Sequence, residues 1–181
     1  GPYGIAVDSQ GNVFVSNLDN NTLVAYHAGQ STPYVSIPFN PFGQALGVDT
    51  DSKDNVWVAC DSGAVFEIPA GSASPQNANL SGINGPIMLT FGKKDQMFVS
   101  NFGGSNVTVY AYGTTTPAYT ITNGIEKNGP TLNGVTKSDY FFQSNQDGAV
   151  SGYKKGKTSP FSTISGIPDP RGIVGYPLVK K

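Results

Sequence analysis

Few residues in this chain have side chains suited to catalysis. It contains one histidine, His27, and one cysteine, Cys60. A catalytic histidine needs an orienting acid and a nucleophile within hydrogen-bond reach, and nothing near His27 in the sequence supplies both. Asp61 follows Cys60 and has the wrong charge to stabilise a thiolate. We therefore expect no catalytic residue: His27 is predicted to be exposed, and Cys60 to be a small buried thiol.

The acidic residues offer one pattern that resembles a metal site. Residues 49–54 (DTDSKD) place carboxylates at alternate positions, as calcium loops do. The pattern lacks the glycine required at the sixth position, and its twelfth position is Cys60 instead of a bidentate glutamate. A single cysteine also excludes a multi-cysteine zinc site. We expect no metal and no cofactor.

Composition excludes two classes of partner. The chain has 181 residues, 11 Lys+Arg, 12 Asp+Glu and a net charge of −1. That balance argues against nucleic-acid binding, and the lysine pairs are too dispersed to follow a phosphate backbone. No run of about eighteen apolar residues exists, so no membrane span is predicted. The 23 glycines and 13 prolines favour short strands joined by turns.

Internal repetition decides the architecture. Three landmarks recur every 40–44 residues: a strand-like segment such as residues 12–17 (NVFVSN), a glycine with a proline four residues later, and a preceding segment that is often Pro-x-Gly. Each unit divides into four short strands, and repeats of this length and pattern are typical of β-propeller blades. Helical repeats are excluded because no window has helical apolar periodicity. The second strand of each unit is apolar on both faces, which predicts a central position, and the third is expected nearer the rim.

We therefore predict an all-β fold: a β-propeller of four-stranded antiparallel blades within a single domain, 1–181. The predicted blades span about 2–40, 45–83, 86–124 and 130–167, and an extra inner strand spans 170–179. Three interpretations of that count stay open. The chain is part of a larger propeller, or another copy completes the ring, or four blades close a ring by themselves.

Residues 2–17 (PYGIAVDSQGNVFVSN) resemble an NHL-type propeller repeat, related in fold to gluconolactonases and streptogramin lyases. The resemblance extends over nearly the whole chain. The second unit departs from it at Cys60, where the others have Asn, and the fourth replaces the Gly-Asn turn with Ser138-Asp139. The resemblance implies a fold, commonly of six blades, more strongly than an activity.

The resemblance also implies where a site would lie. Enzymes of this kind place their reactive groups on the propeller axis, at the entrance to the inner strands. The middle residues of the Pro-x-Gly landmarks would occupy that channel entrance, and they are Tyr3, Leu46, Ile87, Thr131 and Arg171. None is a carboxylate or an imidazole, although absent blades could supply such ligands. Arg171 is the best candidate for an anion contact, with a charge at the chain end as the plainer interpretation.

These observations favour a non-catalytic NHL-like repeat protein that acts as a binding or assembly scaffold. Its partner would be a protein, a glycan, or another copy joined through exposed strand edges. The low charge and the polar turns fit an extracellular or periplasmic protein, and they also fit a cytoplasmic one. Two alternatives remain: a metal-dependent lactonase-like or lyase-like enzyme whose active site needs further blades, and a structural surface protein that assembles with itself.

Overall fold

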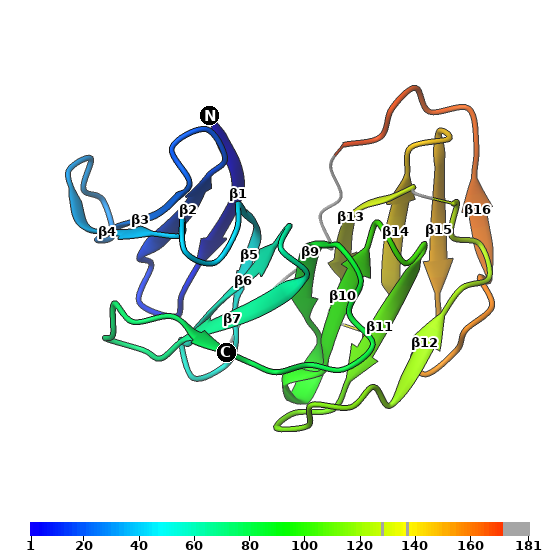
Figure 1. Ribbon diagram of the computed structural model, residues 1–181. Coiled ribbons are helices and arrows are strands. Elements are labelled where there is room, and N and C mark those ends of the chain that lie inside the picture. Colours follow the sequence, from blue (N-terminus) through cyan, green and yellow to red (C-terminus); the bar gives the residue numbers. More distant parts are fainter. Residues whose placement is uncertain (128, 137, 172–181) are drawn as a thin grey trace.

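The computed structural model describes residues 1–127, 129–136 and 138–171, and these residues form four antiparallel sheets of four strands each (Figure 1). The first sheet contains β1 (Pro2–Val7), β2 (Val13–Asn17), β3 (Thr22–Tyr26) and β4 (Pro33–Pro38). The second contains β5 (Ala45–Thr50), β6 (Val56–Cys60), β7 (Ala64–Ile68) and β8 (Gln76–Asn77). The third contains β9 (Pro86–Phe91), β10 (Met97–Asn101), β11 (Asn106–Tyr110) and β12 (Tyr119–Ile121), with a short 3₁₀ helix, η1 (Lys93–Asp95), between its first two strands. The fourth contains β13 (Pro130–Val135), β14 (Phe141–Asn145), β15 (Ala149–Tyr153) and β16 (Ser162–Ile164).

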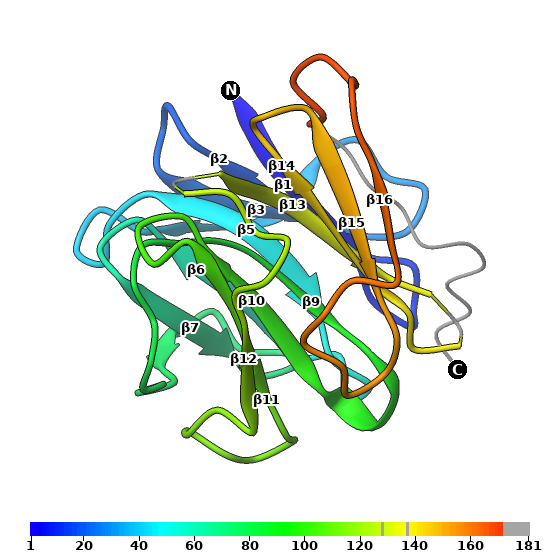
Figure 2. The same ribbon diagram turned by 90° about the vertical axis from the view of Figure 1, so that its right-hand side faces the viewer.

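The strands of every sheet are hydrogen-bonded in chain order, and the sheets stack one upon the next. The first strand of each sheet contacts the first strand of its neighbour, so that β1 lies against β5, β5 against β9 and β9 against β13. Figure 2 shows this stack from the side of the fourth sheet. The predicted fold of propeller blades is confirmed. Of the predicted extra strand, residues 172–179 lie outside the described part of the chain.

Apolar side chains fill the space between successive sheets. Phe14, Leu23, Val58 and Ile68 belong to the core between the first two sheets. The second strand β10 is buried along its whole length, as predicted for second strands, whereas β2 is only partly buried at Val13, Val15 and Asn17. The third strand β11 lies farther from the inner strand than β10, as expected, and it is nevertheless buried at four of its five residues. The reason is that the third sheet is covered on both faces, by the second sheet and by the fourth.

Polar contacts between turns repeat the same stacking. The backbone N–H and hydroxyl of Ser9 donate to Asp54 at 2.8 and 2.6 Å, and Ser52 donates to Asp95 at the same two distances. The N–H of Lys93 donates to Asp139 at 3.0 Å. In the first three sheets, the turn between the first two strands thus binds an aspartate in the corresponding turn of the next sheet.

The aspartates in these turns make two different kinds of contact. Asp8 and Asp51 accept hydrogen bonds from N–H groups two and four residues further on, as Asx-type turns do. Asp54, Asp95 and Asp139 bind the preceding sheet instead. All three have positive φ, between 55° and 64°, a conformation that aspartate and asparagine tolerate better than most residues.

Asp139 has an unusual electrostatic environment. Its burial would raise the pKa of the carboxyl group, but the hydrogen bond from Lys155 at 2.9 Å, the N–H of Lys93 and the charges of both lysines outweigh that effect. The pKa is therefore lower than that of an ordinary aspartate. A carboxyl group with a lowered pKa stabilises the fold above its pKa in the unfolded chain, and this contribution is lost as the pH falls through the folded-state pKa.

We predict that Asp139→Asn lowers the free energy of unfolding at pH 7 by about 1 kcal/mol at most, because Lys155 is largely exposed to solvent. Asparagine still accepts from Lys93 and tolerates the positive φ, but it loses the ion pair. Urea denaturation should show the difference from the wild type shrinking as the pH falls below about 4. Asp147→Asn, in an exposed turn of the same sheet, is the control. A difference that stays constant from pH 7 to pH 3 would contradict the assignment.

Candidate functional site at the start of the inner strands

Four of the five predicted entrance residues occupy the second position of an inner strand: Tyr3 in β1, Leu46 in β5, Ile87 in β9 and Thr131 in β13. At each of these positions the pairing with the second strand shifts register. β-bulges redirect side chains and are common beside active sites. The same irregularity at the same end of four sheets marks this end as a candidate site.

Glycines allow the bulged strands to approach each other closely. A Cβ atom on Gly4 would lie 2.8 Å from the carbonyl oxygen of Leu46, and one on Gly47 would lie 2.5 Å from Cα of Met88. Neither position has room for a side chain without movement of the backbone. The hydroxyl of Ser16 accepts from the N–H of Gly4 at 2.8 Å and donates to the carbonyl of Leu46. The backbone of the candidate site is therefore packed tightly and hydrogen-bonded between sheets.

The side chains at these positions differ in exposure. Leu46 and Thr131 are buried, Ile87 is partly buried, and Tyr3 and Arg171 are exposed. Partial burial raises the pKa of the Tyr3 phenol, while the charge of Arg171 acts in the opposite direction. These two residues are thus close enough for electrostatic interaction, although they lie at opposite ends of the described chain.

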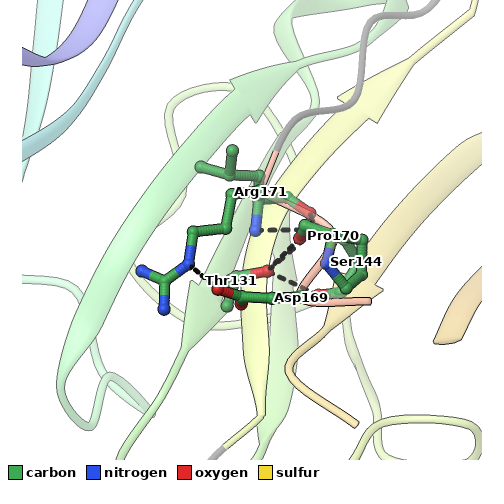
Figure 3. A network of polar contacts seen from close by, with 6 residues as sticks. Thr131, Ser144, Asp169, Pro170 and Arg171 are labelled. Carbon is green, nitrogen blue, oxygen red and sulfur yellow. Dashed lines mark hydrogen bonds and ion pairs between the residues drawn. The ribbon is translucent and has the colours of Figure 1, made fainter. Parts of the chain in front are cut away.

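Figure 3 shows the contacts around Thr131 and Arg171. The Thr131 hydroxyl lies 3.2 Å from the carbonyl oxygen of Pro170 and 2.8 Å from the hydroxyl of Ser144. These contacts hold the chain that follows the fourth sheet against β13. Arg171 donates from Nε to Asp169 at 2.7 Å, and both side chains are largely exposed. The predicted anion-binding arginine therefore already has a carboxylate partner.

Sequence reasoning missed a buried polar cluster between the third and fourth sheets. Ser100 donates to Gln143 Oε1 at 2.6 Å and accepts from Asn133 Nδ2 at 2.8 Å. Gln143 occupies the position at which the other second strands have Val15, Val58 and Val99. A polar residue at an otherwise apolar position of the repeat is the sequence feature that could have predicted this cluster. The cluster contains no titratable group, so it can order the interface but cannot exchange protons.

The remaining candidates lie apart from this end of the sheets. His27 is exposed, as predicted, with Nδ1 at 3.2 Å from Asn12 Oδ1 and its ring stacked on Tyr34. Cys60 is fully buried, also as predicted, and burial together with Asp61 raises the pKa of its thiol to about 12.

The carboxylates of the calcium-like segment point to separate partners. Asp49 accepts from Thr90 and Phe91, Asp51 from Trp57 and its own turn, and Asp54 from Ser9. Within the described residues no three His, Cys, Asp or Glu side chains are placed to share a metal ion. No described helix is long and apolar enough to cross a bilayer.

No family model and no curated protein matches the chain. Solved structures do resemble it. Virginiamycin B lyase from Staphylococcus aureus aligns with a TM-score of 0.73 at 16% identity, over 96% of this chain and 59% of that one. A streptogramin B lyase aligns with a TM-score of 0.77 at 13% identity, over 97% and 59%. Hydrazine synthase from Kuenenia stuttgartiensis aligns with a TM-score of 0.77 at 11% identity, over 92% of this chain and 49% of that one.

The fold is a β-propeller. Identities this low establish the architecture alone, because propellers support many unrelated activities. The chain spans about three fifths of the length of the lyases that it resembles.

We predict that Cys60 resists alkylation in the folded protein. With its pKa raised from 9.0 to about 12, the reactive thiolate at pH 8 is about a thousandfold scarcer than in the unfolded chain. Iodoacetamide labelling followed by mass spectrometry, with and without urea, measures both rates. Rates within tenfold of each other would show that the thiol is accessible and activated.

Proposed function

We propose that this propeller is a non-catalytic binding and assembly scaffold. In support, the four bulged positions hold Tyr3, Leu46, Ile87 and Thr131, whose side chains are poor general acids or bases at neutral pH. Their backbone groups are engaged in packing and hydrogen bonds between sheets. These four positions therefore favour a structural role over acid–base catalysis.

The observation that carries the proposal is an uncovered apolar face on the first sheet. Ile5 is 68% exposed, whereas Val48 and Leu89, at the same place in the next two sheets, are 4% and 1% exposed. Val7 on the same strand is also exposed, at 44%. This face has the same kind of side chains that the other sheets bury against a neighbour.

The occupant that fits this face best is the outer side of the fourth sheet of a second copy. That side has an aromatic cluster in which Phe161 packs against Tyr140 and Phe142 at ring-centre distances of 5.6 and 6.3 Å. Phe161 is 48% exposed and Ile164 is 59% exposed. Joining first sheet to fourth sheet continues the stack already present within the chain. Such a head-to-tail contact produces a ring when the rotation closes and a filament when it does not.

An extracellular or periplasmic location remains part of the proposal. Its support is the low charged fraction of 13% together with turns rich in Ser, Thr and Asn. Fractionation of cells that express the natural gene tests it: recovery in the soluble cytoplasmic fraction would refute it.

A lyase function is the second candidate, favoured by the likeness in fold to the streptogramin B lyase. Incubation with a streptogramin B antibiotic, followed by liquid chromatography, tests it on the product of the full natural gene. We expect an unchanged antibiotic. Enzyme-dependent conversion would replace the scaffold proposal with the lyase one.

We predict that Ile5→Ser combined with Val7→Ser weakens self-association at least tenfold, because the contact loses two apolar side chains. Light scattering coupled to size-exclusion chromatography measures the association over a range of concentrations. Tyr112→Ser, which alters an exposed apolar residue in the turn after β11, should leave it unchanged. A wild-type chain that stays monomeric throughout the range, or a double variant that associates normally, would contradict the proposal.

A further inference from the structure

A cavity of about 470 Å³ lies between the first and second sheets, at the end opposite the bulges. Its apolar wall includes Phe14, Leu23, Ile37, Val56 and Ile68. Its polar side is formed by the turns after β1, β3 and β5. The volume falls within the range of small-molecule sites, which combine apolar walls with a few polar groups.

One residue of the repeat explains why the cavity occurs at this interface. Tyr110 ends β11 and Tyr153 ends β15, and both are buried between sheets, where their hydroxyls donate to the carbonyls of Ser81 and Asn123 at 2.7 and 2.8 Å. Ile68 has the same place at the end of β7, since all three pair with the first residue of the second strand. Isoleucine is smaller than tyrosine and has no hydroxyl. The space that an aromatic ring occupies at the other two interfaces is therefore open here.

Hydrogen bonding determines which ring nitrogen of His27, a residue that lines the cavity, carries the proton. Asn12 donates from Nδ2 to Asp8 Oδ2 at 2.7 Å, and because a carboxylate only accepts, the amide oxygen Oδ1 must face His27. His27 Nδ1 therefore carries a proton and donates to Asn12 at 3.2 Å. In the neutral ring, Nε2 is left as a hydrogen-bond acceptor.

The charged groups that line the cavity are all acidic. Asp8 and Asp54 are the only carboxylates among its described lining residues, and no lysine or arginine lines it. Tyr34, which stacks on His27 with ring centres 4.0 Å apart, adds an aromatic surface. The site thus offers an apolar interior, an aromatic pair and acceptors with negative charge. The apolar interior suits an apolar group of either ligand, whereas the aromatic pair and the negative charge favour a cation over an anion.

We propose that this cavity binds a small amphipathic amine, with its apolar or aromatic body between the sheets and its protonated nitrogen beside Asp8, Asp54 and His27. The site is independent of the proposed assembly function, because its lining residues are distinct from Ile5, Val7 and the aromatic cluster of the fourth sheet.

Two probes with the same ring test the proposal. We expect 2-(1-naphthyl)ethylamine to show saturable binding to the wild-type chain by isothermal titration calorimetry, and 1-naphthaleneacetate to bind at least tenfold more weakly. Equal or tighter binding of the acetate would overturn the choice of ligand charge. Failure of both probes to bind would overturn the site.

Variants locate the binding. Ile68→Tyr fills the cavity with the residue found at the other interfaces and should reduce amine affinity at least tenfold. Thr120→Tyr, which adds the same ring at an exposed position of β12, is the control and should bind like the wild type. Ala73→Trp narrows the exposed edge of the cavity without altering the core, and should reduce affinity even if Ile68→Tyr fails to fold. Asp54→Asn should weaken binding of the amine probe severalfold and should not weaken binding of the acetate probe. Wild-type amine affinity in Ala73→Trp and in folded Ile68→Tyr would place the binding elsewhere and refute the proposal.

Discussion

The fold depends on burying the apolar faces of the four-stranded sheets against one another, and the second and third sheets are covered on both faces. Val107 and Val109 of β11 face the fourth sheet, while Tyr110 faces the second, so one strand contributes to two cores. A single sheet of this size would leave both of these sets in water, at a cost of about 1.5–3 kcal/mol for each large apolar side chain. Stability is therefore a property of the interfaces, as in other repeat architectures.

The same requirement explains the polar features. The aspartate bridges between turns and the close approach at Gly4 and Gly47 all join one sheet to the next. Each sets the spacing of the inner strands. The bulges then recur at one end of the stack because each sheet meets its neighbour in the same way. A surface built from equivalent positions of several sheets is suited to contacts that no single sheet could make.

Much of this architecture could be predicted from the sequence, because the repeat landmarks report local structure. The alternating residues of 12–17 and the turn glycines determine where strands begin and end, and the stacking follows from their apolar faces. What could not be predicted depends on contacts between repeats. The bridge from Ser9 to Asp54 joins residues 45 positions apart, and neither residue signals its partner. The bulges likewise depend on how two strands pair, which the residue types of one strand do not reveal.

Departures from the repeat are more informative about function than the repeat itself. A residue shared by all units is explained by the packing of sheet on sheet. A residue that differs in one unit is either not required for that packing or has a different role. Ile68 replaces a tyrosine that would fill the interface, and Gln143 replaces a valine and introduces a buried polar cluster. The first change opens a cavity beside acidic groups. The second places Gln143 in hydrogen bonds with Ser100 and the carbonyl of Leu132, while Asn133 Oδ1 in the same cluster is buried without a hydrogen-bond partner. Only the change at Ile68 leaves unfilled space, and the charged side chains that line this space are all acidic. For that reason it is the departure that points to a ligand.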